Sequence, residues 1–381
     1  MFSLFLLALS RHLTLVGLAV AALFDRRRRW VGRLLLLVLA PVFLAMQLLT
    51  WLFWLLDEIL FPRYRDVEIH SPLFVVGPPR TGTTFMHHVL AADEQTTTFR
   101  LWECLFGVTI CGRRICRALI KLDQLTGRVI SRLGARVMRG LQSSMDDVHP
   151  LGLDDPEEDF LLFLPLAACF LIAVPFPEAR WLFAFSRFDT DVAPRDRSLY
   201  MRWYRRCIQK HLYVNGPDAR FLSKNASFAG TVNSLLDEFP DARIISTWRE
   251  PLESVPSQLS SLRPGLEALG FTKYDDGFRD ALLEQMVFYY HHLGAAEQRH
   301  PERIARIDNV AMRERLQSSV TDAFAQLGLE VSDSLKAELE RRSEASRKHR
   351  SSHEYSLEEF GLNAELIRSR FEQSGDGPEI V

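Results

Sequence analysis

The feature that most constrains the fold of this chain is a short apolar run followed directly by a glycine-rich turn. The run is Leu73–Val76, and the turn at residues 77–84 has the sequence GPPRTGTT. An apolar run of this length beside a glycine predicts a buried strand, and a helical pattern continues from Thr83 to about Ala92. A strand, a glycine-rich turn and a helix in this order open a parallel α/β fold.

The turn resembles the phosphate-binding loop of nucleotide triphosphatases but lacks one of its parts. Gly77 and Gly82 have the required spacing and Thr84 occupies the hydroxyl position, whereas Thr83 stands where that loop has its lysine. Gly82 lets the backbone approach a phosphate, whose charge the helix N-terminus and Arg80 would both favour. We therefore expect a phosphate-bearing ligand here.

A second predicted strand, at residues 243–247, is followed by Arg249 and, eight residues later, by Ser257. No Asp ends this strand, so the magnesium ligand of a triphosphatase is missing and we expect no metal site. A guanidinium and a hydroxyl group suit a phosphate dianion. An Arg and a Ser eight residues apart are not specific evidence by themselves. They indicate a phosphate site here because each of the two phosphate-binding segments follows a predicted strand.

Alternation of strands and helices continues along the body and predicts an α/β fold: a phosphate-loop-like parallel sheet with helices on both faces. A further strand is expected at 221–223. Helices are expected at 198–214, 229–238, 277–298, 311–327 and within 355–373, and loops at the acidic segment 154–159 and the basic segment 341–352.

The N-terminal region is hydrophobic. We expect residues 1–61 to form membrane-associating helices and residues 62–381 to form the catalytic domain. Residues 34–56 carry no charge, and a helix of that length reaches across a bilayer core of about 30 Å. Residues 2–24 are also mostly apolar, and an arginine cluster lies between the two stretches.

Three topologies remain open for this region. Both stretches cross the membrane, only residues 34–56 cross, or the two form a hairpin that lies at the interface. Arg11, His12 and Pro41 suit an interfacial hairpin, and Trp51 and Trp54 could anchor it at the headgroup level.

Composition limits the remaining classes of function. The formal net charge of −2 gives no whole-chain signal for nucleic acid. Five cysteines without a CxxC pair or a His cluster argue against zinc and against a disulfide framework. Only six of the 46 basic residues are Lys, an arginine bias that points toward a bacterial source.

The two phosphate-binding segments together resemble those of sulfotransferases that use 3′-phosphoadenosine-5′-phosphosulfate (PAPS). The form is closer to the bacterial and protein-tyrosine enzymes than to the cytosolic members with a histidine base. The resemblance covers roughly residues 72–372 and implies that PAPS is bound, without metal, by the following residues: Pro79, Arg80, Thr81, Gly82, Thr83, Thr84, Phe85, Arg249, Ser257 and Lys348.

The same resemblance implies the catalytic residues. Glu103, 23 residues after Arg80, falls near the catalytic base of the tyrosine enzymes. Lys224, 25 residues before Arg249, falls near their catalytic Lys, and together with Arg80 it would stabilise charge on the transferring group.

Other groups are weaker candidates. The histidines His87 and His88 lie within the first predicted helix, where packing or solvent exposure is the expected role, and His149 could line an acceptor site. The acidic residues Glu157, Glu158 and Asp159 could bind a polar acceptor, but a solvated acidic loop is the favoured interpretation.

The implied function is sulfuryl transfer from PAPS to a hydroxyl, less favourably an amine, of a membrane-associated or amphiphilic acceptor. The alternatives are a nucleotide-dependent kinase or NTPase, and a non-catalytic membrane binding protein of the same fold. We expect a cytoplasmic catalytic domain, with a type II membrane protein and lumenal domain as the alternative. The acceptor and the oligomeric state stay open.

Overall fold

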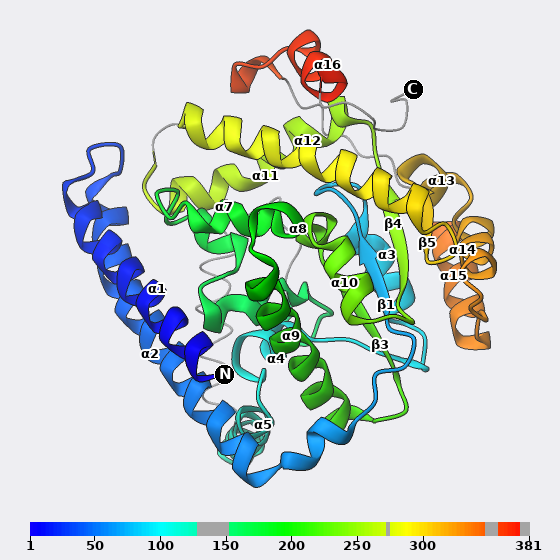
Figure 1. Ribbon diagram of the computed structural model, residues 1–381, viewed down its shortest axis with the longest axis horizontal. Coiled ribbons are helices and arrows are strands. Elements are labelled where there is room, and N and C mark those ends of the chain that lie inside the picture. Colours follow the sequence, from blue (N-terminus) through cyan, green and yellow to red (C-terminus); the bar gives the residue numbers. More distant parts are fainter. Residues whose placement is uncertain (128–151, 272–274, 347–356, 374–381) are drawn as a thin grey trace.

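The computed structural model describes residues 1–127, 152–271, 275–346 and 357–373 (Figure 1). Its centre is a five-stranded, wholly parallel sheet in the order β2-β3-β1-β4-β5. The strands are β1 (Leu73–Val76), β2 (Thr96–Thr97), β3 (Arg220–Lys224), β4 (Arg243–Trp248) and β5 (Ile304–Asp308). The predicted α/β fold with a parallel sheet is confirmed.

The strand order brings the predicted segments together at one edge of the sheet. Strand β1 lies in the middle and pairs with β3 on one side and β4 on the other. Strands β2 and β3 are therefore added on one side of β1 and β4 and β5 on the other, which makes the carboxyl ends of β3, β1 and β4 a topological switch point. Open α/β sheets bind their ligands at such a point.

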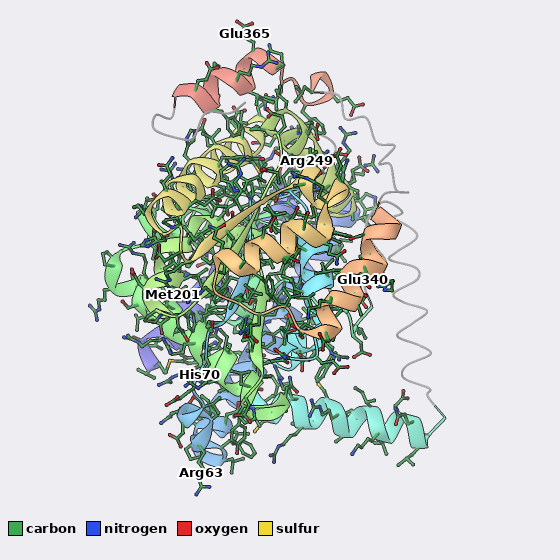
Figure 2. The ribbon with its side chains drawn as sticks, turned by 90° about the vertical axis from the view of Figure 1, so that its right-hand side faces the viewer. Arg63, His70, Met201, Arg249, Glu340 and Glu365 are labelled. Atoms are coloured by element: carbon green, nitrogen blue, oxygen red, sulfur yellow. The ribbon has the colours of Figure 1, made fainter. Side chains whose placement is uncertain are left out.

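Helices cover both faces of the sheet, and α5 projects from the body (Figure 2). The helices of the body are α3 (Thr83–Leu90), α4 (Leu101–Phe106), α5 (Ile110–Leu125), α7 (Trp181–Ser186), α8 (Phe188–Asp191), α9 (Pro194–Asn215), α10 (Val232–Glu238), α11 (Pro251–Ala268), α12 (Asp276–Arg299), α13 (Asn309–Glu314), α14 (Leu316–Gln326), α15 (Asp333–Ser346) and α16 (Ala364–Gln373). The 3₁₀ segments used below are η3 (Asp159–Leu166), η4 (Phe170–Ala173) and η5 (Ala226–Gly230).

Two predicted boundaries are wrong. The helix expected at 311–327 is divided into α13 and α14, because Arg315 leaves the helical region with φ −138° and ψ 40°. The basic segment predicted as a loop from residue 341 instead continues α15 as far as Ser346.

The alternation of side chains along β1 separates two hydrophobic cores. Leu73 and Val75 face the smaller core, which α3, α13, α14 and α15 cover. Phe74 and Val76 face the larger core, which contains α9, α12 and residues of the two N-terminal helices. The sheet is thus buried on both faces, as parallel sheets are.

The N-terminal region forms a helical hairpin, α1 (Phe2–Ala21) and α2 (Trp30–Leu60), along one side of the body (Figure 1). Near the C-terminal end of α2, the Trp51 indole donates to Pro165 O at 2.9 Å. The fully buried Asp57 pairs with the equally buried Lys210 at 3.0 Å. The hairpin therefore shares the larger core with the body.

The turn of the hairpin is also fixed to the body. Arg28 is buried, lies 3.8 Å from the ring centre of Phe271 and donates to Pro175 O at 2.8 Å. A Cβ on Gly32 would lie 2.1 Å from Leu269 O, so α2 begins in direct contact with the end of α11. Both ends of α2 are thus packed on the body.

The outward face of the hairpin remains apolar and exposed. Both helices are long and apolar enough to cross a membrane. Of the most apolar stretch of each helix, 28% is buried in the first and 22% in the second. Large exposed side chains follow the outer face of α2, including Leu34, Val38, Val42, Leu49, Leu52 and Leu55. Exposed apolar surface of this extent indicates an interaction site.

Candidate active site

The turn after β1 is held in a strained conformation close to the end of β4. A Cβ on Gly77 would lie 2.3 Å from Thr247 Oγ1 and 2.5 Å from Thr247 O, so only glycine fits. Arg80 has φ 70°, and Gly82, which precedes α3, has φ 102°. The first N–H groups of a helix lack intrahelical partners, so α3 offers them to a ligand at this turn.

The two predicted phosphate-binding segments meet in the structure. Arg80 Nε donates to Ser257 Oγ at 3.0 Å, and Arg249 Nη1 approaches Arg80 O at 3.4 Å. Ser257 is buried on α11, whereas the Arg80 side chain is exposed. Three residues that are far apart in the sequence thus bring two guanidinium groups and a hydroxyl group to the turn.

Neighbouring contacts fix the position of Arg249. The Tyr290 hydroxyl of α12 donates to Arg249 O at 2.6 Å and lies 2.8 Å from Ser254 Oγ. The guanidinium pairs with Glu253 on α11 at 2.8 Å, through a carboxylate that is 60% exposed. A surface pair of this kind is weak, so an anion could compete for the guanidinium at little cost.

The other residues of the turn divide into buried and exposed groups. Thr81 is buried, and its Oγ1 lies 2.7 Å from Thr247 Oγ1. Thr83 is buried and Thr84 is exposed at the start of α3. Phe85 packs against the smaller core, with the Arg342 guanidinium 5.9 Å from its ring centre.

Lys224 lies at the carboxyl end of β3 and is buried. Its ammonium group contacts the Glu158 carboxylate in an ion pair. Burial lowers the pKa of His87 well below its usual value, and the charge of Lys224 lowers it further. His87 is therefore neutral and hydrogen-bonds Thr98 Oγ1 at 2.8 Å.

The acidic segment is not a solvated loop, which corrects the favoured interpretation from sequence. Asp159 is fully buried, accepts a hydrogen bond from the Tyr204 hydroxyl, and burial raises its pKa to about 7. Glu157 is half-buried, and burial also raises its pKa, although nearby Lys224 opposes the rise. Glu158, in the same acidic segment, contacts Lys224 at the carboxyl end of β3. These carboxylates therefore lie at the switch-point edge of the sheet.

Glu103 lies in a different environment, a buried polar cluster. Its Oε1 pairs with Arg113 Nη1 at 3.0 Å, its Oε2 accepts from the Arg100 N–H that precedes α4, and Asn215 Nδ2 lies 3.3 Å from Oε1. Arg113 and Glu103 are 0% and 3% exposed. The contacts of this carboxylate are those of a group that fixes α4 against α5 and α9.

The remaining sequence candidates have different outcomes. Lys348 and His149 lie outside the described residues, and His88 is half-buried on α3. The acidic residues were undervalued because their burial depends on α9 and β3, more than 40 residues away. Within the described ranges, no group of three or more His, Cys, Asp and Glu side chains could hold a metal ion.

The chemistry of the site fits a nucleotide that carries two separate phosphate groups. The turn and Arg80 could hold one anion, and Arg249 and Ser257, which both contact Arg80, could hold a second beside it. Thr83, which is buried, occupies the position where a triphosphatase needs lysine. These residues fit PAPS, whose phosphosulfate and 3′-phosphate would occupy the two anion sites.

Comparisons with known proteins agree with this geometry. The omega-hydroxy-beta-dihydromenaquinone-9 sulfotransferases Stf3 of Mycobacterium tuberculosis and Mycobacterium bovis are each 26% identical over 189 residues, which is 49% of this chain and 44% of the relative. The chain thus spans less than half the length of these curated relatives.

Solved structures share the fold over nearly the whole chain. Sulfotransferase STF9 from Mycobacterium avium matches 100% of this chain and 97% of its own, with a TM-score of 0.74 and 20% identity. Sulfotransferase STF1 from Mycobacterium tuberculosis H37Rv matches 95% and 92%, with a TM-score of 0.66 and 19% identity. The sulfotransferase family model matches residues 72–333, which include both phosphate-binding segments. This chain therefore belongs to the sulfotransferase family.

Proposed function

We propose that the protein transfers a sulfuryl group from PAPS to a hydroxyl group, less favourably an amine, of an apolar acceptor. The observation that carries this proposal is the contact between Arg80 Nε and Ser257 Oγ at 3.0 Å. It joins the turn, proposed to bind the phosphosulfate, to the α11 segment, proposed to bind the 3′-phosphate with Arg249. Family membership and the fit of two separate anion sites support the donor assignment.

The proposed reaction is an in-line transfer without a covalent enzyme intermediate. The acceptor oxygen forms a bond to sulfur as the bond between sulfur and the phosphate oxygen breaks, and the acceptor proton passes to a carboxylate. Lys224 and Arg80 stabilise the negative charge that develops on the sulfuryl oxygens and on the leaving phosphate. Both side chains belong to segments at the carboxyl edge of the sheet.

We assign the general base to Glu158, in place of the sequence prediction Glu103. Glu158 contacts Lys224, and a base must lie within hydrogen-bond reach of the proton that it takes. Glu103 is only 3% exposed and is held in a buried pair with Arg113, so it is not accessible to an acceptor.

Two isosteric variants separate these carboxylates. We expect Glu158→Gln to reduce the kcat of the folded protein by about 10²–10⁴-fold, because a general base contributes that much. Glu103→Gln is expected to lower the denaturation midpoint while turnover of the folded fraction persists. A loss of turnover in well-folded Glu103→Gln, with normal turnover in Glu158→Gln, would restore the sequence prediction.

The acceptor is proposed to be a membrane-associated amphiphile. The curated relatives are named for omega-hydroxy-beta-dihydromenaquinone-9, a hydroxyl group on an apolar molecule. In this chain, the exposed apolar face of the hairpin supports delivery of such a molecule from a bilayer.

We further propose that residues 1–61 dock on the bilayer surface without crossing it, and that the catalytic domain, residues 62–381, faces the cytoplasm. The turn of the hairpin contacts Phe271 and Leu269, and Asp57 pairs with Lys210, so crossing would break contacts at both ends of α2. A protease added outside sealed, right-side-out vesicles, whose interior is the cytoplasmic side, should leave the body intact. Digestion of the body under these conditions would favour the lumenal or periplasmic alternative.

The donor assignment is tested by calorimetric binding of adenosine 3′,5′-bisphosphate to the full chain. We expect micromolar affinity that falls at least tenfold in Arg80→Ala and in Arg249→Ala, because each removes a charged hydrogen bond. Exposed Arg313, on α13, supplies a matched Arg→Ala control. Tighter binding of ATP–Mg²⁺ would support the kinase or NTPase alternative, and no binding of either by the folded protein would support a non-catalytic role.

A further inference from the structure

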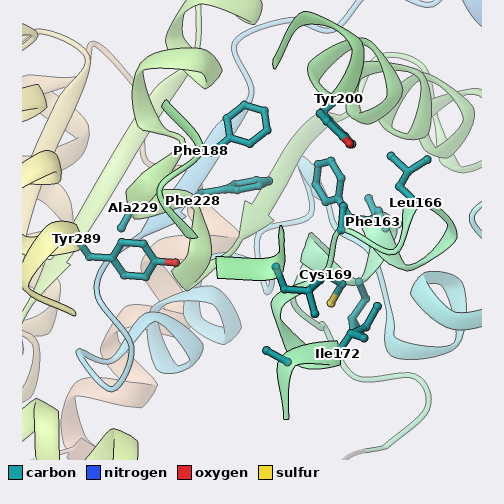
Figure 3. Packing of buried hydrophobic residues seen from close by; sticks show 14 of the residues in the cluster. Phe163, Leu166, Cys169, Ile172, Phe188, Tyr200, Phe228, Ala229 and Tyr289 are labelled. Atoms are coloured by element: carbon teal, nitrogen blue, oxygen red, sulfur yellow. The ribbon is translucent and has the colours of Figure 1, made fainter. Parts of the chain in front are cut away.

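An aromatic pocket lies beside the proposed catalytic residues, between η3, η4, α7, α8, α9 and η5. Figure 3 shows Phe163, Phe188 and Phe228 around the same space, with Tyr200 nearby. The phenylalanine side chains that line the pocket are Phe160, Phe163, Phe170, Phe185, Phe188 and Phe228. Such walls favour an apolar ligand.

One polar group in this pocket is buried without a partner. Asn225 is 0% exposed and lines the pocket. Its Oδ1 accepts a hydrogen bond from Ser227 N at 2.9 Å, which fixes the orientation of the amide group. Its Nδ2 has no hydrogen-bond partner among the described residues. A buried donor without an acceptor costs about 1–3 kcal/mol, so Asn225 points to a ligand atom that accepts a hydrogen bond.

Two chain segments connect the pocket to the residues that we propose carry out the transfer. Asn225 directly follows Lys224 at the end of β3, and Phe160 directly follows Asp159 in the acidic segment. Lys224 and Glu158 form an ion pair across these two segments. The pocket therefore adjoins the two chain segments that carry Lys224 and Glu158.

We propose that this pocket binds the hydrocarbon body of an alcohol acceptor and that Asn225 Nδ2 donates a hydrogen bond to its hydroxyl oxygen. The inference rests on the proposed function and specifies its substrate class, an alcohol on a narrow, unbranched or lightly branched chain. The free space is about 30 Å³, room for one or two water molecules, so the rings must turn to admit even a narrow chain.

The hairpin contacts the far wall of the pocket. Arg11 of α1 donates to the Tyr200 hydroxyl at 2.7 Å, and its guanidinium lies 5.1 Å from the ring centre of Phe185, a pocket residue. Helix α1 thus lies between the pocket and the exposed apolar face of the hairpin. A chain that extends beyond the pocket would leave it along α1, toward the proposed bilayer.

Calorimetric binding of 1-octanol to the full chain tests this inference. We expect Ala168→Phe, which fills the pocket, to abolish binding. Asn225→Asp, which keeps the acceptor for Ser227 N but removes the Nδ2 donor, should weaken binding about tenfold. Ala184→Phe, at a half-buried position that does not line the pocket, is the matched control and should bind normally. If Ala168→Phe fails to fold, Ser227→Phe fills the same space from another wall.

Adenosine 3′,5′-bisphosphate binding, measured on the same samples, separates this inference from the proposed function. Bisphosphate binding should stay unchanged in every pocket variant. Failure of 1-octanol to bind, or equal binding by wild type and Ala168→Phe, would overturn the pocket assignment while the donor site stands. Loss of bisphosphate binding in the wild type would instead overturn the proposed function, and the 1-octanol result would still decide whether the pocket takes an alcohol.

Discussion

At the scale of single residues, burial gives Asp159 a titration that should be visible in the stability of the whole protein. Its carboxyl group is fully buried between Tyr204 and Ser223, and burial raises the pKa to about 7 from the ordinary value of 3.8. Between these two values the folded state holds a proton that the unfolded state has released. Stability contributed by this group is therefore present below about pH 4 and is lost as pH rises through about 7.

We expect Asp159→Asn, an uncharged isostere, to flatten this dependence. The free energy of unfolding, measured with urea at pH 5 and pH 8, should fall between the two pH values in the wild type and fall less in the variant. Asp154→Asn is the control, because that carboxylate is 79% exposed and pairs with the exposed Arg100. An unchanged slope in Asp159→Asn would mean that Asp159 is ionised in the folded protein.

The candidate residues show how far sequence alone reaches at this scale. Arg80, Arg249 and Ser257 could be predicted because a local pattern marks each of them, and the structure brings them together. Glu103 and Glu158 could not be distinguished, because both are acidic residues beside apolar sequence. Their surroundings are set by Arg113 for one and by Lys224 for the other, and these contacts depend on tertiary structure.

At the scale of elements, the turn after β1 depends on its close approach to β4. We expect Gly77→Ala to separate the two strands, because its Cβ would lie 2.5 Å from the Thr247 backbone oxygen. Overpacking of this kind costs about 1–3 kcal/mol. Calorimetry should show loss of bisphosphate binding, and urea denaturation should show a lower midpoint.

The control for this prediction is Gly17→Ala, at a helical position of α1 where an added Cβ meets nothing within 4 Å. It should leave bisphosphate binding unchanged and stabilise the helix by about 0.5–1 kcal/mol, because alanine loses less backbone entropy than glycine. Normal bisphosphate binding by Gly77→Ala would show that the turn tolerates displacement from β4.

Elements could be predicted where the sequence pattern is strong and local. The strands at β1 and β4 are apolar runs, whereas β5 alternates buried and exposed residues and β2 has only two residues, so both were missed. Helix α11 contains Pro256 and Pro264, which ordinarily disfavour a helix. Packing against α12 and α16 supports its helical form.

At the scale of the whole molecule, a buried ion pair between Asp57 and Lys210 helps to hold the hairpin against the catalytic body. Replacing Lys210 by Met would leave the Asp57 carboxylate buried without its cation, although the Ile110 and Cys111 N–H groups would still donate to it. Breaking a buried pair in this way costs about 3–5 kcal/mol. We expect a correspondingly lower urea midpoint, and partial recovery in Asp57→Asn/Lys210→Met, which removes both charges. Equal midpoints for wild type and Lys210→Met would show that the pair does not hold the hairpin.

The exposed face of the hairpin makes a prediction about the molecule as it meets a bilayer. Because both ends of α2 are fixed to the body, the outer face can lie on a membrane only as a rigid surface. Val38 and Val42 are 62% and 51% exposed on this face. Val38→Glu/Val42→Glu should therefore reduce co-sedimentation with phosphatidylethanolamine–phosphatidylglycerol vesicles at least tenfold, with an unchanged thermal midpoint.

Val310→Glu provides the matched control for this double variant, because Val310 is 63% exposed on α13, away from the hairpin. It should sediment with vesicles as the wild type does. Sulfation of a water-soluble alcohol should persist in the double variant, whereas sulfation of an alcohol embedded in vesicles should fall with binding. If the double variant stays bound to vesicles, another surface docks the protein, and the apolar face of the hairpin must serve a partner other than lipid.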